Sequence, residues 1–154
     1  MSQGFVQRGG LWVLAQAVFM GVIGILGITN RNGLGHGRLF LAGIAFLVVA
    51  AICGLAGIAA LGRSLTPFPK PSATAQLVQH GIYAIIRHPL YTAVFCAAVG
   101  WSLIWQSWPA LAVSLVLAIF FDAKARHEER LLRDKFLNYA AYERRVRRFI
   151  PWLY

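Results

Sequence analysis

The hydrophobic positions of this chain are gathered into long uncharged blocks. An apolar run without a charge extends over residues 11–28, and a longer one extends over residues 39–61. A helix rises about 1.5 Å per residue, so about 20 apolar residues cross the roughly 30 Å of hydrocarbon in a bilayer. The pattern therefore predicts two membrane-spanning helices between the N-terminus and Leu61.

Two shorter apolar runs follow, over residues 90–105 and 109–121, and together they are typical of a helical hairpin. Ser107 suits an N-cap, and Pro109 suits the first turn of the second helix. The tryptophans near this turn, typical of an aromatic belt at a membrane interface, are Trp101, Trp105 and Trp108. No glycine or proline occurs between Ala110 and Ile150, so we expect the last helix to continue well beyond the membrane.

These runs predict an all-α, polytopic membrane protein with four transmembrane helices, the last two a hairpin, and a C-terminal helical tail. We expect one membrane-embedded domain over residues 1–154. It comprises two N-terminal spans (1–61), a connecting loop (62–90) in which 76–86 forms a short interfacial helix, and a hairpin with its tail (90–154). Small residues at spacing three, which allow helices to approach closely, are Gly21, Gly24 and Gly27 in the first span and Gly54 and Gly57 in the second.

The basic residues predict the orientation. Nine of the fifteen lysines and arginines lie after Phe121, and none lies in the tryptophan-rich turn. Because positive charge is retained on the cytoplasmic side, we expect a multi-pass protein with both termini and the 62–90 loop in the cytoplasm. In a bacterium this would be the inner membrane. The expected contacts with anionic headgroups are made by Arg144, Arg145, Arg147 and Arg148.

Composition narrows the function classes. The chain is 58% hydrophobic and carries a formal net charge of +10. Because the chain also has long hydrophobic blocks, its excess of basic residues favours contact with an anionic membrane surface. We therefore expect no nucleic-acid partner. The two cysteines and four histidines have no spacing suited to a disulfide or a metal site, so we expect no metal.

The stretch 81–91 places polar and ionisable side chains between apolar runs, which is costly at a bilayer and suggests a site. His88 precedes the hairpin turn by almost the same number of positions as Glu128 follows it. In two antiparallel helices these positions reach the same level, so Arg87 and His88 should meet Glu128 and Glu129, with Pro89 bounding the third helix there.

Consecutive helical residues point about 100° apart, so the two glutamates cannot both face one neighbour. One can meet Arg87 while the other faces a cationic ligand. The alternative is an ion pair at a helix end with a second, solvated charge.

Several of these segments resemble the isoprenylcysteine carboxyl methyltransferase family, whose general plan is shared by the related phospholipid N-methyltransferases. The segments are LVQHGIYAIIRHPLY over 77–91, EERLL over 128–132, and then Phe136, Tyr139, Tyr142, Val146 and Ile150-Pro151. The resemblance covers residues 62–151. The first two spans match the family only in being hydrophobic.

The resemblance implies an integral membrane methyltransferase that uses S-adenosylmethionine and acts on a lipophilic acceptor at the cytoplasmic membrane face. It implies a cofactor pocket built by the C-terminal half and open sideways to lipid. By position, Arg87 and Glu128 would hold the acceptor, although which glutamate has which role is open. The residues that would bind cofactor are Gln79, Tyr83, His88, Tyr91, Glu129, Tyr139 and Tyr142. The last two tyrosines would cover the adenine, or else pack the tail on the membrane face.

The sequence departs from the family pattern in three places. Ala93 stands where glycine is common, the segment between Phe136 and Tyr139 lacks a glycine and is one residue short, and only four spans are present. A phospholipid N-methyltransferase-like enzyme and a non-catalytic membrane family member therefore remain alternatives. The absence of charged residues in the middle of the spans disfavours a transporter. The sequence identifies neither the acceptor nor the oligomeric state.

Overall fold

The computed structural model of the chain describes residues 9–30, 34–66, 68–69 and 76–151. These residues form helices and no strand, and an isolated bridge between Ile86 and Arg147 is their one strand-like pairing. The α-helices are α1 (Gly10–Ile28), α2 (Gly37–Leu61), α3 (Pro89–Ile104), α4 (Trp108–Lys135) and α5 (Tyr139–Arg145). Two 3₁₀ turns, η1 (Gly62–Ser64) and η2 (Gly81–Ala84), precede α3.

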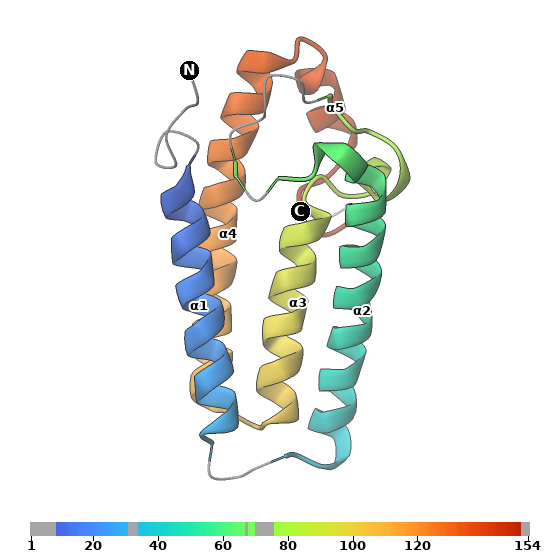
Figure 1. Cartoon of the computed structure of the whole chain (residues 1–154). Coiled ribbons are helices and arrows are strands. Elements are labelled where there is room, and N and C mark those ends of the chain that lie inside the picture. Colours follow the sequence, from blue (N-terminus) through green and yellow to red (C-terminus); the bar gives the residue numbers. More distant parts are fainter. Residues whose placement is uncertain (1–8, 31–33, 67, 70–75, 152–154) are drawn as a thin grey trace.

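Helices α1 to α4 lie side by side as a bundle (Figure 1). Helix α3 is central, because it packs against α2, α4 and α1, whereas α1 packs on α4 and α3. The α3–α4 turn lies at one end of the bundle. The end of α4, the short helix α5 and both 3₁₀ turns gather at the opposite end, where the candidate site forms.

The bundle has the surface of a membrane protein. Helices α1, α2 and α4 are long and apolar enough to cross a bilayer, whereas α3 is apolar but has only 16 residues. Large apolar side chains on the outside of the bundle are exposed, such as Leu55 at 70% and Ile119 at 72%. Because exposed apolar surface of this extent requires lipid or a partner to cover it, and three helices can span, the chain is an integral membrane protein.

The α3–α4 hairpin forms as the sequence predicts. Ser107 is the N-cap of α4 and accepts a hydrogen bond from the Ala110 amide at 3.4 Å, and Pro109 lies in the first turn. A buried hydrogen bond of 3.2 Å joins the hydroxyls of Ser102 and Ser114 between the two helices. The register of the hairpin is thereby fixed near its turn.

One expectation about helix extent is confirmed and one is wrong. Helix α4 has 28 residues and is therefore longer than the roughly 30 Å of hydrocarbon in a bilayer, as expected. Helix α4 ends at Lys135, because Phe136 adopts an extended conformation and the chain turns back into α5. This break allows Tyr139 and Tyr142 to pack against Leu132, and burying these rings outweighs the helical preference of the segment. The helix expected over 76–86 is only the 3₁₀ turn η2, which begins at Gly81 with a positive φ of 59°.

Glycines let α2 and α3 approach to backbone contact. A Cβ atom on Gly100 would lie 2.8 Å from the Gly43 carbonyl oxygen, and one on Gly43 would lie 2.9 Å from the Gly100 carbonyl oxygen. Gly57 packs under a leucine of α3, and Gly27 packs under a tryptophan of the same helix. The predicted packing role is therefore confirmed for Gly27 and Gly57.

The predicted packing role is not found for two glycines of α1, and a third glycine, on α2, makes only an ordinary contact. Gly21 and Gly24 have open space where their Cβ atoms would stand. Gly54 faces Ala93, where a Cβ on the glycine would make an ordinary contact of 3.6 Å. Ala93, the departure from the family pattern, is thus accommodated by a glycine on the facing helix.

We predict that Gly100→Leu destabilises the protein by at least about 1–3 kcal/mol, the typical cost of overpacking, because the added side chain must displace backbone of α2. Thermal unfolding in detergent measures this. Gly21→Leu is the matched control and should leave the midpoint almost unchanged. Equal shifts in the two variants would contradict the packing of α2 on α3.

Candidate functional site

Arg87 and His88 meet Glu129 at the end of the hairpin, as predicted, whereas Glu128 contacts Tyr91 rather than either of them. His88 Nε2 lies 3.0 Å from Glu129 Oε1, and the Tyr91 hydroxyl donates to Glu128 Oε2 at 2.5 Å. Arg87 and His88 directly precede α3, whose first residue is Pro89. Counting positions back from the hairpin turn therefore predicted the level correctly.

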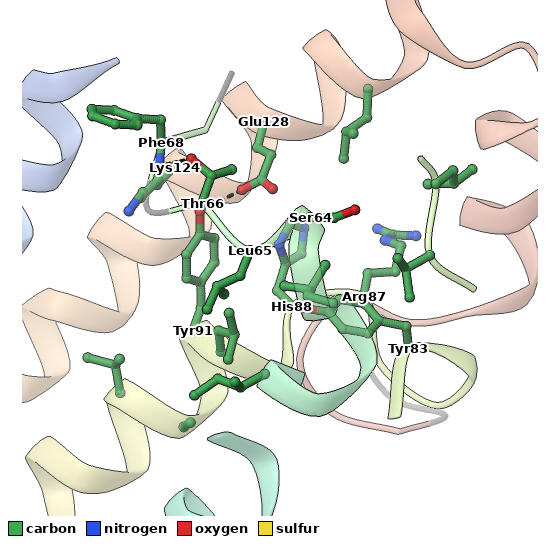
Figure 2. A pocket seen from close by; sticks show the side chains of 18 of the residues that line it. Ser64, Leu65, Thr66, Phe68, Tyr83, Arg87, His88, Tyr91, Lys124 and Glu128 are labelled. Carbon is green, nitrogen blue, oxygen red and sulfur yellow. Dashed lines mark hydrogen bonds between the residues drawn. The ribbon is translucent and has the colours of Figure 1, made fainter. Parts of the chain in front are cut away.

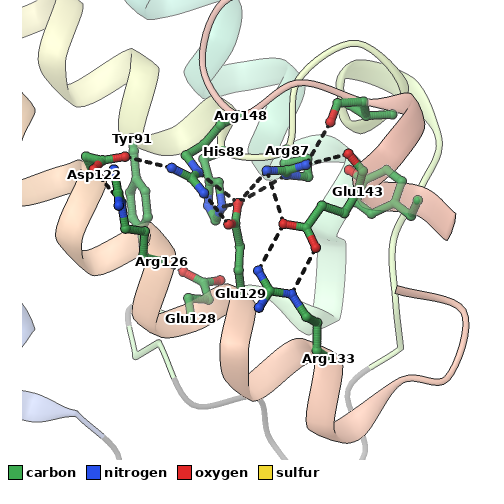
Figure 3. Close-up of polar contacts among 12 residues, drawn as sticks. Arg87, His88, Tyr91, Asp122, Arg126, Glu128, Glu129, Arg133, Glu143 and Arg148 are labelled. Atoms are coloured by element: carbon green, nitrogen blue, oxygen red, sulfur yellow. Dashed lines mark hydrogen bonds and ion pairs between the residues drawn. The ribbon is translucent and has the colours of Figure 1, made fainter. Parts of the chain in front are cut away.

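Glu129 is the centre of a buried ion cluster, which we define as Glu129, Arg87, His88 and Arg148 (Figure 3). Its side chain is 0% exposed. Glu129 Oε1 lies 2.9 Å from Arg87 Nη2, and Glu129 Oε2 accepts from Arg148 Nη2 at 2.6 Å. Such charge-assisted bonds offset the cost of burying a carboxylate, which is high for an unpaired charge.

Arg87 also fastens the tail to the start of α3. Its Nη1 donates to the carbonyl oxygens of Glu143 at 2.8 Å and Val146 at 2.9 Å. Its backbone amide donates to the Arg147 carbonyl at 2.8 Å, and the His88 amide donates to the Arg148 carbonyl at 3.1 Å. The ion cluster and this short backbone pairing together hold residues 143–148 against residues 86–88.

Arg148 corrects an expectation, because the sequence analysis placed it against lipid headgroups. Its side chain is only 15% exposed, and its Nη1 donates to Asp122 Oδ1 at 2.7 Å while its Nη2 binds Glu129. The hydrogen bonds to Glu129 raise the pKa of the Arg148 guanidinium above its ordinary value. Asp122 and Glu129 are about two helical turns apart on α4, so one arginine can bridge both. Arg144, Arg145 and Arg147 remain exposed.

A cavity of about 530 Å³ lies beside the ion cluster (Figure 2). All four long helices and the segments around η1 and η2 contribute to its wall. Glu128 lines this cavity, about 100° around α4 from the buried Glu129. Within the described part of the chain, the Tyr91 hydroxyl is the one hydrogen-bond donor to the Glu128 carboxylate, which leaves its Oε1 available to a ligand. The polar and aromatic residues of the wall are Gln16, Ser64, Thr66, Phe68, Gln76, Tyr83, Arg87, His88, Tyr91, Lys124, Glu128, Tyr139 and Tyr142.

Aromatic rings form much of this wall. His88 stacks on Tyr91 with ring centroids 5.2 Å apart, and Tyr91 stacks on Phe121 at 5.0 Å. The Tyr142 hydroxyl donates to the Tyr83 carbonyl at 2.7 Å, and burial raises the pKa of Tyr142 to about 12. Burial also raises the pKa of Tyr83. Both phenols are therefore protonated near neutral pH and serve as hydrogen-bond donors or neutral ring faces.

The predicted site residues separate into two groups. Tyr83, Arg87, His88, Tyr91, Glu128, Tyr139 and Tyr142 line the cavity. Glu129 lies in the ion cluster behind this wall, and Gln79 accepts a hydrogen bond from Arg145 at 3.3 Å outside it. Tyr139 and Tyr142 are buried against α4 and also line the cavity, and their contact with an adenine stays a prediction. The shortened segment before Tyr139 does not prevent this burial.

Sequence reasoning missed Lys124 and Gln16, whose side chains meet in the cavity wall with Lys124 Nζ donating to Gln16 Oε1 at 2.7 Å. Two signals were available. Lys124 is four positions before Glu128 and so shares its helix face. Gln16 is the one amide side chain in α1, an otherwise apolar helix.

The cavity has the chemistry to hold an organic cation that also carries a flat ring system. A carboxylate and several aromatic faces suit a cation, and flat faces suit a heterocycle. The volume is in the range of small-molecule sites, about 300–1,000 Å³. Among the residues that the structure describes, no three histidine, cysteine or acidic side chains are grouped as a metal site would require.

Comparison with known proteins finds two relatives of similar sequence, one structure of similar fold and one matching family profile. The chain is 28% identical over 115 residues to a probable protein-S-isoprenylcysteine O-methyltransferase of Oryza sativa subsp. indica, covering 72% of this chain and 60% of that protein. It is 36% identical over 78 residues to the cobalt-zinc-cadmium resistance protein CzcN of Cupriavidus metallidurans, covering 50% and 36% of the two chains. The chain therefore spans less than two thirds of the length of these relatives.

The fold is similar to that of the eukaryotic intramembrane Ras methyltransferase ICMT, isoprenylcysteine carboxyl methyltransferase. The TM-score is 0.68 at 21% identity, and the match covers 98% of this chain and 55% of that structure. At this level of identity the similarity concerns the fold alone.

The sequence profile of the phospholipid methyltransferase family matches residues 39–138. This range contains most of α2, the loop, α3 and α4, including Arg87, His88, Glu128 and Glu129. It accounts for more than half of the chain and confirms the resemblance that the motifs indicated. The chain belongs to the phospholipid methyltransferase family, with the fold of the intramembrane isoprenylcysteine methyltransferases.

Proposed function

We propose that this protein is an S-adenosylmethionine-dependent methyltransferase acting on a lipophilic acceptor at the cytoplasmic membrane face. The observation that supports this most strongly is the pair of adjacent glutamates. Glu129 is fully committed to the ion cluster, whereas Glu128 presents a carboxylate with an available oxygen to a cavity walled by aromatic rings.

The cavity wall suits the proposed cofactor, which carries a sulfonium, an ammonium, a carboxylate and an adenine. Glu128 would take one of the cationic groups, and the ring faces of Tyr83, Tyr91, Tyr139 and Tyr142 would take the adenine or the sulfonium. His88 lies between these groups, and its Nδ1 is not used by Glu129. When bound, the cofactor supplies a methyl group on a sulfur that leaves as a neutral thioether.

The chain contributes by positioning and orienting the cofactor and the acceptor and by excluding water from the cavity. An in-line methyl transfer needs two reactants held at the correct distance in a dry cavity more than it needs a strong base. Glu129 acts here as a positioning residue, since it holds Arg87 and His88 in the wall and ties them to the tail. We assign to Gln79, which lies outside the wall, no direct contact with the cofactor.

Access from the membrane is provided by the packing of the helices. In the described part of the chain α1 packs on α4 and α3 rather than on α2. The cavity between α1 and α2 is lined on this side by apolar residues, which include Val13, Ile58, Leu90 and Val94. An apolar acceptor dissolved in the bilayer can thus enter between α1 and α2 without crossing water.

We also propose that α3 is a fourth span and that both ends of the chain lie in the cytoplasm. Helix α3 would reach only about 24 Å, but it is enclosed by α1, α2 and α4, so its polar start needs no contact with lipid. The exposed arginines of α4 and α5 lie at the same end as the cavity, as the positive-inside rule requires.

The proposed orientation predicts different labelling, in intact cells, of two variants that each carry one added cysteine. Asp134→Cys lies at the cavity end and should be protected from a membrane-impermeant maleimide until the membrane is permeabilised. Leu34→Cys, at the opposite end and 54% exposed, should react at once. The wild-type protein controls for the buried Cys53 and Cys96. Immediate labelling at position 134 would reverse the proposed topology.

We predict that the purified full-length protein binds S-adenosylmethionine, or its demethylated product, in calorimetry. Glu128→Gln should weaken binding about tenfold or more, because hydrogen bonds to charged groups contribute roughly 1.5–3 kcal/mol. Asp134→Asn is the matched control, since Asp134 is an exposed acid further along the same helix. Its affinity should stay within about twofold.

Two outcomes would contradict the proposal. The absence of binding heat in the wild-type protein would favour a non-catalytic family member. Equal losses in Glu128→Gln and Asp134→Asn would show that the cavity carboxylate has no specific part in cofactor binding. Incubating membranes with radiolabelled cofactor and fractionating the lipids would then identify the acceptor.

A further inference from the structure

Lys124 is a buried cation that the proposed cofactor site does not use. It lies on α4 one turn before Glu128, lines the same cavity, and is 1% exposed (Figure 2). Charged side chains inside the spans of a membrane protein are costly and are typically functional. A lysine near a helix end can usually extend to the interface, but this one points inward.

The surroundings of Lys124 leave its charge without a bonded counter-ion. Its Nζ donates to Gln16 Oε1 at 2.7 Å and lies 4.9 Å from the centroid of the Tyr91 ring. Among the described residues no carboxylate lies within ion-pair distance of it, although the Glu128 carboxylate one turn away interacts with it electrostatically. Asp122, two positions earlier, is paired with arginines on another face of α4. Glu128 lines the same cavity, but its carboxylate accepts from Tyr91 rather than from the lysine.

An ammonium carries three hydrogens, and here one of them has an oxygen acceptor in the described structure. Burying a charge without a partner is strongly unfavourable, so a group that completes this site should be an anion. Gln16 and Tyr91 hold the ammonium in the wall from two sides, which fixes where such an anion would sit.

On the basis of the proposed function, we propose that Lys124, held by Gln16 and Tyr91, binds an anionic group of the acceptor. The acceptor classes that this admits are a carboxylate, a thiolate and a phenolate. Each of these has a lone pair available for methylation and no proton to lose. A protonated amine would be repelled by the ammonium and would not bind at Lys124, although the Glu128 carboxylate of the same cavity can attract it.

A purely structural role for Lys124 predicts something different. If the lysine only ties α4 to α1 through Gln16, replacing either residue alters stability but leaves the charge preference of the cavity unchanged. The ratio of affinities for an anionic and a cationic probe of the same chain length therefore separates the two roles.

The experiment uses the full-length protein in nanodiscs of one zwitterionic lipid, with radiolabelled dodecanoate and dodecylamine as probes in a scintillation proximity assay. We expect the wild-type protein to bind dodecanoate, and dodecylamine shows whether a variant changes the affinity for both charges alike. Lys124→Met, which keeps the chain length without the charge, should lose about tenfold or more of the dodecanoate affinity. Lys135→Met, at an exposed lysine of the same helix, is the matched control and should keep it.

Gln16→Glu tests the same point without removing the lysine. The new carboxylate would neutralise the Lys124 ammonium in place and form an ion pair, so folding should be preserved while dodecanoate affinity falls as in Lys124→Met. This variant keeps the test valid if Lys124→Met does not fold.

Two results would overturn the proposal. One is a Lys124→Met variant that keeps the wild-type affinity for dodecanoate. The other is a Gln16→Glu variant with the wild-type affinity ratio. Calorimetry of the wild-type preparation with S-adenosylmethionine is a separate readout, so failure of the cofactor proposal is distinguished from failure of the Lys124 proposal.

Discussion

The buried carboxylate of Glu129 is the interaction on which the rest of the site depends. It accepts hydrogen bonds from Arg87 just before α3 and from Arg148 in the tail, and both arginines are mostly buried. Three separate parts of the chain are thereby fixed to one another. Removing one partner of a buried charge pair typically costs about 3–5 kcal/mol, because the remaining charges are left uncompensated. The tail can cover the cavity only while this cluster is intact.

The neighbouring glutamate can have a different role because of helical geometry alone. A rotation of about 100° separates Glu128 from Glu129, so one faces the basic cluster and the other faces the cavity. A structural ion pair and a ligand-facing carboxylate thus come from two consecutive residues of one rigid helix. The aromatic stack of His88, Tyr91 and Phe121 runs beside them and connects the cluster to the cavity wall. Both glutamates stand on α4, and a helix suits a site that must position its ligands.

Much of this arrangement was predictable because it follows from the lengths of the apolar runs and from the regular rise of an α-helix. Apolar runs gave the helices, and the count of positions from the Ser107 turn gave the level at which His88 meets Glu129. The break at Phe136 was not predictable, since it depends on burial of Tyr139 against α4 rather than on any local helix-breaking residue. Lys124 and Gln16 were also missed, because they are 108 positions apart and only the packing of α1 on α4 brings them together.

The central claim is that Glu129 holds the tail over the cavity while Glu128 does not. Amide hydrogen exchange in Glu129→Gln and Glu128→Gln, compared with the wild-type protein, tests it most directly. The amides to follow belong to Arg87, His88, Tyr142 and Val146, which donate to backbone carbonyls in or beside the tail. We predict that these amides exchange faster in Glu129→Gln and at the wild-type rate in Glu128→Gln. Unchanged protection in Glu129→Gln, or equal loss in both variants, would contradict the account.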